Sequence, residues 1–193
     1  MGKVILDISM SLDGYVTAAG QTAAAPVGPG GEVLHDWAFG EDERGRQVLE
    51  DGVAGLGAVV TGRITYDTSL PWWGPNGPSG SARRPVFVVT HQEPAQCPDA
   101  GVYTFVTDGI ESALKQAKAA AGEQDVCVMG GANVAQQYVA AGLLDEISIH
   151  LVPVLFGGGT RLFEHLGDEH IRLEPVATVE TPPAVHLRFR VLR

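Results

Sequence analysis

Short apolar runs recur along the chain and are separated by glycine, proline and small polar residues. Residues 2–9 (GKVILDIS) form the first run, and Ser11-Leu12-Asp13-Gly14 supplies turn residues after it. Residues 57–62 and 85–90 form two further runs, and the second is apolar on both faces, as is typical of a strand inside a covered sheet. The pattern predicts strands at all three positions.

Two helices are predicted, one after each of two further strands at residues 102–106 and 125–129. The first helix has apolar residues with i, i+3, i+4, i+7 spacing, namely Ile110, Ala113, Leu114 and Ala117. Asp108 and Glu111 have the spacing of a capping box, which predicts where this helix begins. The second helix is expected to bury Val134, Ala135, Tyr138 and Val139. A third helix is expected within residues 41–54.

The last third of the chain alternates apolar and polar residues, at 146–151, 170–173 and 185–191. In the final segment we expect the polar side chains to face water and the apolar ones to face the core, which is the pattern of an antiparallel strand with one wet face. The side chains expected to face the core are Val185, Leu187, Phe189 and Val191, and those expected to face water are His186, Arg188 and Arg190.

The chain shows no internal repeat and no domain boundary, so we predict a single α/β domain over residues 1–193. Its βαβ units form a mostly parallel sheet flanked by helices, and an antiparallel C-terminal hairpin closes that sheet. Residues 18–31 and 69–84 contain glycine and proline without periodicity and are predicted to be long loops.

The net charge of −10 and the pI near 4.9 argue against nucleic acid or an anionic membrane surface as a partner. No apolar stretch approaches the ~20 residues that span a bilayer, and the N-terminus lacks the features of a signal peptide. Cys97 and Cys127 form no CxxC pair, so a reducing cytoplasm is the expected location.

Several motifs of large enzyme classes are missing: GxGxxG, GxxxxGK[ST], HExxH and GxSxG. His165 and His170 lack neighbouring carboxylates or cysteines at metal-ligand spacing, so no metal site is predicted.

Three segments share one form, in which an apolar strand ends in a small polar or glycine turn. They are VVTGRITYD (59–67), FVVTHQEP (87–94) and VCVMGGANV (126–134). The carboxyl ends of parallel strands lie side by side, and backbone N–H groups at such turns can bind an anion. Three junctions in register predict a ligand with several phosphates, such as a dinucleotide. Within the third, Gly130-Gly131 is either the bend between strand and helix or a surface that a phosphate approaches.

These features resemble known proteins. Gly62-Arg63-x-Thr65, the Thr90 turn and Gly130-Gly131, followed by an antiparallel end, are similar to the dihydrofolate reductase fold. SLDG at 11–14, VMGGANVAQQYVAAGLLDEI at 128–147 and PVLFGGGTRLF at 153–163 resemble the reductase domain of bacterial riboflavin biosynthesis, the RibD C-terminal-like family. The resemblance covers nearly the whole chain and implies a reductase that uses NADPH. It also implies a homodimer formed through the C-terminal strands.

The resemblance implies the cofactor-binding residues by position. Gly62, Arg63 and Thr65 would hold phosphates. Thr90, His91 and Gln92 would lie beside the adenosine ribose and its 2′-phosphate. The residues bordering the pyrophosphate and the nicotinamide ribose would be Gly130, Gly131, Ala132, Asn133 and Val134. On this reading the glycine pair is a cofactor contact rather than a plain bend.

The substrate side departs from both relatives. The Leu-Pro-Trp of dihydrofolate reductases follows the first strand, whereas Leu70-Pro71-Trp72 follows the second one here. Asp36 is the candidate acidic group, or else an ordinary carboxylate at a helix start. Asp13 is the second candidate, or else it shapes its turn. The basic residue that the riboflavin-type domain carries after SLDG is replaced by Tyr15-Val16-Thr17, which weakens the case for a phosphorylated pyrimidine.

Aromatic side chains are candidates for stacking on a flat heterocycle, although core packing explains each of them equally well. These candidates are Trp37, Tyr66, Trp72 and Trp73. The expected function is an NADPH-dependent reductase of a small heterocyclic substrate, resembling 5-amino-6-(5-phosphoribosylamino)uracil reductase. The alternatives are a dihydrofolate reductase and a non-catalytic NADP-binding protein.

Overall fold

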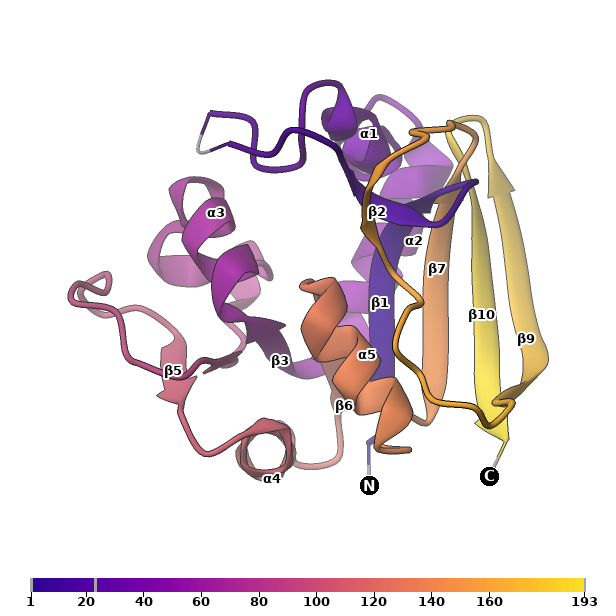
Figure 1. The fold of residues 1–193 in the computed structure, drawn as a ribbon. Helices are drawn as coiled ribbons and strands as arrows, with labels where there is room; N and C mark the ends of the chain where they lie inside the picture. The colour runs from indigo at the N-terminus through magenta and orange to yellow at the C-terminus, as the bar shows by residue number, and fades with distance from the viewer. Residues whose placement is uncertain (1, 23, 193) are drawn as a thin grey trace.

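An eight-stranded sheet organises the computed structural model of the chain, which describes residues 2–22 and 24–192 (Figure 1). The strand order across the sheet is β5-β4-β3-β6-β1-β7-β10-β9. Six strands run parallel: β1 (Val4–Ser11), β3 (Leu56–Gly62), β4 (Val86–Val89), β5 (Tyr103–Val106), β6 (Asp125–Val128) and β7 (Glu146–Val152). The last two form an antiparallel hairpin: β9 (Arg172–Thr181) and β10 (Ala184–Leu192). This arrangement confirms the predicted mixed α/β architecture.

Helices cover both faces of this sheet. On the near face in Figure 1, α4 (Ile110–Ala121) and α5 (Ala132–Ala140) pack on the main hydrophobic core. The other face carries α1 (Asp36–Phe39), α2 (Glu43–Gly55) and α3 (Arg63–Trp73). Within the described residues, no helix is long and apolar enough to cross a bilayer.

The predicted stripes on α4 and α5 are confirmed, but the start of α4 is not the predicted one. Ala113, Leu114 and Ala117 are buried in the main core. The N-cap of α4 is Gly109, which has φ +99° and makes no side-chain cap bond. Because this conformation favours glycine, the helix begins after Gly109 and Asp108 lies outside the cap position. The predicted capping box is therefore wrong.

Residues 69–84 do not form one long loop, since α3 extends to Trp73 and two 3₁₀ turns follow it at Gly74–Asn76 and Gly80–Ala82. Pro71 lies inside α3, in its last turn. Proline and glycine residues in this segment favour a loop in sequence terms. Pro71 removes one helical hydrogen bond and its ring crowds the carbonyl of Asp67, and α3 ends two residues later, at Trp73.

A second, two-stranded antiparallel sheet joins β2 (Tyr15–Ala18) to β8 (Gly159–Arg161). It brings the turn after β1 next to the glycine-rich segment after β7. The carbonyl of Gly14 accepts a hydrogen bond from the Leu162 backbone N–H at 3.0 Å. Residues 19–22 and 24–30 contain turns but no helix or strand, in agreement with the predicted loop, and the 3₁₀ helix Gly31–His35 leads into α1.

The C-terminal strand differs from the prediction, because the side chains expected to face the core are only half-buried and one expected to face water is buried. His186 is only 6% exposed and lies edge-on to Trp37, with 4.9 Å between the ring centroids. The prediction for His186 is wrong because α1 covers the end of β10 that carries it. Arg188 and Arg190 keep at least partial exposure and pair with Glu146 and Glu174, respectively.

Candidate functional site

The three predicted junctions converge at one edge of the sheet. Strands β4, β3 and β6 are consecutive neighbours, and α3 and α5 begin where β3 and β6 end. A β-carbon at Gly130 would lie 2.6 Å from Cγ2 of Thr65, and one at Gly131 would lie 3.7 Å from Cα of Gly62. The first turns of α3 and α5 therefore lie against each other.

Two helix N-termini face this edge. The N-cap residues of α3 and α5 are Gly62 and Gly131, and neither makes a side-chain cap bond. The first N–H groups of a helix have no intrahelical partner, and the helix dipole adds positive potential there. The edge can therefore attract an anion although the protein as a whole is acidic.

Gly130 and Gly131 both adopt the left-handed conformation, with φ of +75° and +80°. This backbone favours glycine, so the bend between β6 and α5 is a sufficient reason for glycine at both positions. The bend also leaves the backbone of the junction without β-carbons on the side of Gly62 and Thr65. The glycine pair can therefore form the bend between strand and helix and also be the surface that a phosphate approaches.

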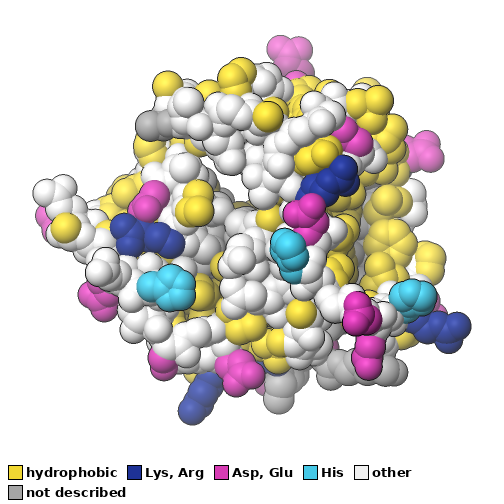
Figure 2. All heavy atoms as spheres, in the orientation of Figure 1, with side chains coloured by type: hydrophobic (Ala, Val, Ile, Leu, Met, Phe, Trp, Pro, Cys, Tyr) yellow, Lys and Arg dark blue, Asp and Glu magenta, His cyan; other side chains and the backbone are white. Residues whose placement is uncertain are grey.

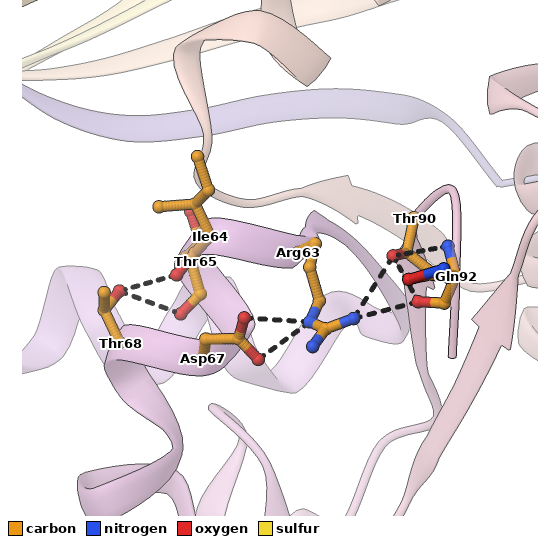
Figure 3. A network of polar contacts seen from close by, with 7 residues as sticks. All are labelled: Arg63, Ile64, Thr65, Asp67, Thr68, Thr90 and Gln92. Carbon is orange, nitrogen blue, oxygen red and sulfur yellow. Dashed lines mark hydrogen bonds and ion pairs between the residues drawn. The ribbon is translucent and has the colours of Figure 1, made fainter. Parts of the chain in front are cut away.

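Arg63 links α3 to the turn after β4 (Figure 3). Its Nε lies 2.8 Å from both carboxylate oxygens of Asp67, and its Nη1 donates to the carbonyl of Gln92 at 2.8 Å. The hydroxyl of Thr90 donates to the same carbonyl at 2.7 Å. These contacts fix the guanidinium at the carboxyl edge of the sheet. The Arg63 side chain is 32% exposed there. His91 is exposed in the same turn.

Figure 2 shows the surface hollowed between the part of the molecule that carries α3 and the part that carries α5 and β2. Lys and Arg side chains are sparse on this face. Local positive potential near the hollow therefore depends on a few groups, namely the two helix N-termini and Arg63.

Asp13 anchors a loop. Its carboxylate accepts hydrogen bonds from the Ser11 hydroxyl at 2.6 Å and from the backbone N–H groups of Phe156 and Gly157 at 3.1 and 2.7 Å. The Ser11 bond and these backbone bonds lower the pKa of Asp13 to about 2. A carboxyl group that stays ionised in this way suits a structural role, in which it ties the SLDG turn to the glycine-rich segment after β7, better than the role of an acid.

The remaining predicted side chains lie in different surroundings. Asp36 is exposed at the start of α1. Trp37 is 5% exposed, donates from Nε1 to the Ser9 hydroxyl at 2.9 Å, and stacks on His150 with 3.9 Å between centroids. Tyr66 is 1% exposed and packs edge-on against Tyr103 and Phe105, which makes it a core residue rather than a stacking surface. Trp73 is half-buried at the end of α3.

A polar row in the middle of the sheet was not predicted from the sequence. Along β1, Asp7, Ser9 and Ser11 face α1 and α2, whereas Leu6 and Ile8 contribute to the main core on the opposite face. On β7, Ser148 and His150 lie beside this row. The apolar packing on this face is consequently divided into two clusters, one under α3 and one under α1. The alternation of apolar and polar residues in positions 6–11 (LDISMS) was the available signal.

A cavity of about 340 Å³ lies over this row, beneath α2. Its polar lining includes Asp7, Ser148, His150, His186 and Arg188. Trp37 and Met129 also line it, and Met129 immediately precedes Gly130. The lining therefore stops at the residue before Gly130, and it also includes Leu56 and Asp125 at the amino ends of β3 and β6.

Comparison with known proteins agrees with the fold and the family that the sequence resembles. The family model described as the RibD C-terminal domain matches residues 2–187. A candidate riboflavin biosynthesis protein from Shewanella sp. PV-4 has the same fold, with 22% identity, a TM-score of 0.73 and 99% of each chain covered. A Thermotoga maritima diaminohydroxyphosphoribosylaminopyrimidine deaminase/5-amino-6-(5-phosphoribosylamino)uracil reductase is 15% identical, with a TM-score of 0.66 over 99% of this chain and 57% of that one. Enterococcus faecalis dihydrofolate reductase complexed with NADP(H) is 17% identical, with a TM-score of 0.64 over 98% and 96%.

Proposed function

The chain belongs to the RibD C-terminal domain family, and on that basis we propose that it is an NADPH-dependent reductase of a small heterocyclic substrate. The observation that carries the proposal is the contact between the first turns of α3 and α5, together with the cavity beneath α2. A dinucleotide needs positive potential for its phosphates and a neighbouring site for the ring that is reduced. The helix N-termini lie at the carboxyl edge of the sheet, where ligands of open α/β sheets bind, and the cavity lies on the face of the sheet beneath α2.

The residues at this edge fit NADPH. The N–H groups that open α3 and α5 are available to phosphate oxygens, and the glycines of the β6–α5 junction present no β-carbon to the ligand. We assign the phosphates to Gly62, Arg63 and Thr65, with Arg63 on the 2′-phosphate side beside Thr90, His91 and Gln92, since its Nη1 contacts the Gln92 carbonyl. The nicotinamide side is assigned to Gly130, Gly131, Ala132, Asn133 and Val134. When bound, the cofactor supplies the hydride, and the protein orients the two reactants and excludes water.

The cavity beneath α2 suits a small ring. Its volume of about 340 Å³ is near the lower end of the ~300–1,000 Å³ range of ligand pockets. The indole of Trp37 offers an apolar wall and the Asp7–His150 pair offers polar groups. Asp36 is not part of the lining within the described residues, so a proton source other than Asp36 is needed at this position. The volume favours a single heterocycle over an extended ligand such as folate.

We also propose a homodimer formed through the C-terminal hairpin. Strand β9 is ten residues long, lies at the edge of the sheet and is mostly exposed. Leu173 and Val176 on β9 are 41% and 43% exposed, and Leu192 on β10 is 45% exposed. A long exposed edge with apolar side chains is a surface that proteins usually cover, and a second copy would cover it symmetrically.

Calorimetry with NADPH, NADH and NADP⁺ tests the binding claim, and loss of reduced-nicotinamide absorbance tests the reaction. The acceptor panel contains dihydrofolate, aminopyrimidines and flavins. We expect tight NADPH binding and oxidation by an aminopyrimidine-type acceptor. Methotrexate-sensitive oxidation by dihydrofolate would support the dihydrofolate reductase alternative. NADPH binding without oxidation by any acceptor would support a non-catalytic binding protein, and no NADPH binding would contradict all three.

A further inference from the structure

A two-stranded ribbon, made of β2 and β8, lies at the carboxyl end of β1 (Figure 1). Strand β2 begins directly after the turn that follows β1, and β1 is the neighbour of β6 in the large sheet. Helix α5 begins where β6 ends. The β2–β8 ribbon and the first turns of α5 are therefore neighbours at the edge of the sheet that we assign to the cofactor.

Gln136 joins α5 to this ribbon. Its side-chain Nε2 donates to the carbonyl of Arg161, the last residue of β8, at 3.2 Å and to the carbonyl of Leu162 at 3.0 Å. Gln136 is only 9% exposed, and Ala135 and Val139 on the same helix belong to the main hydrophobic core. An amide nitrogen carries two hydrogens, so this buried group uses both of its donors on one short segment.

A second link holds the segment that leads into β8. The Asp13 carboxylate accepts hydrogen bonds from the backbone N–H groups of Phe156 and Gly157. Between the two links the chain runs directly against β2, because a β-carbon at Gly159 would lie 1.9 Å from the carbonyl oxygen of Thr17. A two-stranded ribbon is at best marginally stable by itself in water. The position of the ribbon therefore depends on links to other elements, and Gln136 supplies one to α5.

Helix α5 is also held by α3. A β-carbon at Gly62 would lie 3.0 Å from Cγ2 of Val134, in the first turn of α5. The hollow in Figure 2 separates the part of the molecule that carries α3 from the part that carries α5 and β2, so α5 and the β2–β8 ribbon lie on the same side of it. A movement of the ribbon would therefore alter the wall beside residues 130–134, which we assign to the nicotinamide side of the cofactor.

We propose that Gln136 is a positioning residue of the reduction, which holds the β2–β8 ribbon against α5 and so keeps the wall at the nicotinamide end in one place. The inference rests on the proposed function. Gln136 is buried and bonded to the backbone of the ribbon, so it acts through the ribbon and does not itself touch the reactants.

Positioning affects the reaction more than it affects cofactor binding. Transfer of a hydride needs the two reacting carbons in close alignment, and a displacement of about 1 Å can lower the rate roughly a hundredfold. Most of the affinity for a dinucleotide comes from its phosphates, which we assign to the start of α3 and to Arg63, on the side of α5 away from the ribbon. A loosened ribbon should therefore lower kcat and leave NADPH affinity nearly unchanged.

The link is tested without any ligand by amide hydrogen exchange of Gln136→Met, which keeps the length of the side chain and removes both donors. Tyr138→Phe is the matched control, because it removes the bond that the Tyr138 hydroxyl makes from α5 to the carbonyl of Ile110 in α4, at 2.9 Å. We expect the Leu162 N–H, which is bonded to the carbonyl of Gly14, to exchange at least tenfold faster in Gln136→Met and at the wild-type rate in Tyr138→Phe. Wild-type exchange in a folded Gln136→Met variant would overturn the proposal.

The positioning role is tested with the acceptor found in the NADPH oxidation screen, at a temperature where circular dichroism shows both variants folded. We expect Gln136→Met to lower kcat at least tenfold, with NADPH affinity within twofold of wild type, and Tyr138→Phe to leave both unchanged. A purely structural role would lower Tm in both variants and leave kcat intact in both. Unchanged kcat in Gln136→Met, or an equal loss in Tyr138→Phe, would overturn the role.

Asp13→Ala extends the test to the other link and replaces Gln136→Met if that variant does not fold. It removes the acceptor of the Phe156 and Gly157 N–H groups, so it should also speed exchange at Leu162 and lower kcat at nearly unchanged NADPH affinity. Faster exchange with unchanged kcat would overturn the role. A protein that neither binds nor oxidises NADPH would refute the proposed function, and the positioning role with it, whereas failure of the positioning role alone leaves NADPH binding and oxidation intact.

Discussion

Gly130 lies directly against Thr65: a β-carbon at position 130 would be 2.6 Å from Cγ2 of the threonine. The two residues belong to different strand–helix junctions, and their contact sets how closely α3 and α5 begin beside each other. This packing explains a glycine at position 130 independently of any ligand. It also makes a prediction about stability that does not involve the cofactor.

Gly130→Ala should destabilise the protein by about 2 kcal/mol, because the left-handed backbone disfavours a β-carbon and the methyl group collides with Thr65. Thr65→Ser removes the Cγ2 atom, so the double variant should recover about 1 kcal/mol relative to the sum of the single effects. Equilibrium urea unfolding of the four proteins measures this coupling. Additive effects would show that the two junctions do not press on each other.

Arg63 should decide the preference for NADPH over NADH. We expect Arg63→Gln to weaken NADPH binding at least tenfold, about 1.4 kcal/mol, and to leave NADH binding nearly unchanged. Asp67→Asn should tighten NADPH binding, because it removes the carboxylate that now pairs with the guanidinium. Calorimetry with both cofactors measures the preference. A parallel loss of NADPH and NADH affinity would indicate that Arg63 only links α3 to the Gln92 turn.

His186 should make the protein less stable as the solution becomes acidic. Its pKa is about 4 in the folded protein and near 6.5 when unfolded, so between these values the unfolded chain binds the extra proton and stability falls as the pH falls. His186→Gln should flatten the dependence of Tm on pH in this window. Burial also lowers the pKa of His35, which acts in the same direction and stays in both proteins.

His170→Gln is the matched control for that experiment, since His170 is exposed and should leave the wild-type slope intact. The lowered pKa values of Asp7 and Asp13 act at more acidic pH, below the ordinary aspartate value near 3.9, and do not overlap with this window. An unchanged slope in His186→Gln would mean that His186 takes up its proton in the folded state as readily as in the unfolded chain.

The proposed homodimer predicts a species of about twice the 20.3 kDa chain mass at micromolar concentration. Val176→Lys places a charge on the exposed face of β9 and should convert the dimer to a monomer, because the buried charge would lack a partner. Multi-angle light scattering distinguishes the dimer from the monomer. A monomer in the unmodified protein would refute the dimer while leaving the cofactor site untouched.

The sequence predicted the architecture well because each βαβ unit carries its own local signal. The stripe at Ala113, Leu114 and Ala117 and the apolar strand at 85–90 depend only on periodicity, and both fit the structure. The start of α4 was wrong because Gly109 adopts a backbone that the capping-box pattern does not consider. Helix α3 was not predicted, and its last five residues, 69–73, lie in the segment that glycine and proline residues led us to predict as a loop.

The edge of the sheet that we assign to the cofactor was easier to predict from the sequence than the cavity beneath α2. The junctions at Gly62 and Gly130 are each marked by a short local motif, and parallel strands bring such motifs together. The polar row has no motif: Asp7 and His150 are 143 positions apart, and His186 is contributed by a third strand. A single polar residue in a strand that alternates apolar and polar residues is predicted to face water. Only the covering of that face by α1 and α2 turns them into an internal cluster.

NADPH binding by Gly131→Val tests the central claim most directly. The variant and its matched control, Gly122→Val, both place a branched residue at a left-handed position, and Gly122 lies at the end of α4 with no atom within 4 Å of its β-carbon position. Both should lose some stability through backbone strain. At about 15 °C we expect both to remain folded by circular dichroism.

Only Gly131→Val should lose NADPH affinity, because its side chain projects toward Gly62 and Thr65, the residues that we assign to the phosphates. Calorimetry at that temperature should give a loss of roughly a hundredfold, about 2.7 kcal/mol, for Gly131→Val and wild-type affinity for Gly122→Val. A folded Gly131→Val variant that binds NADPH as tightly as the unmodified protein would contradict the assignment of this junction to the cofactor.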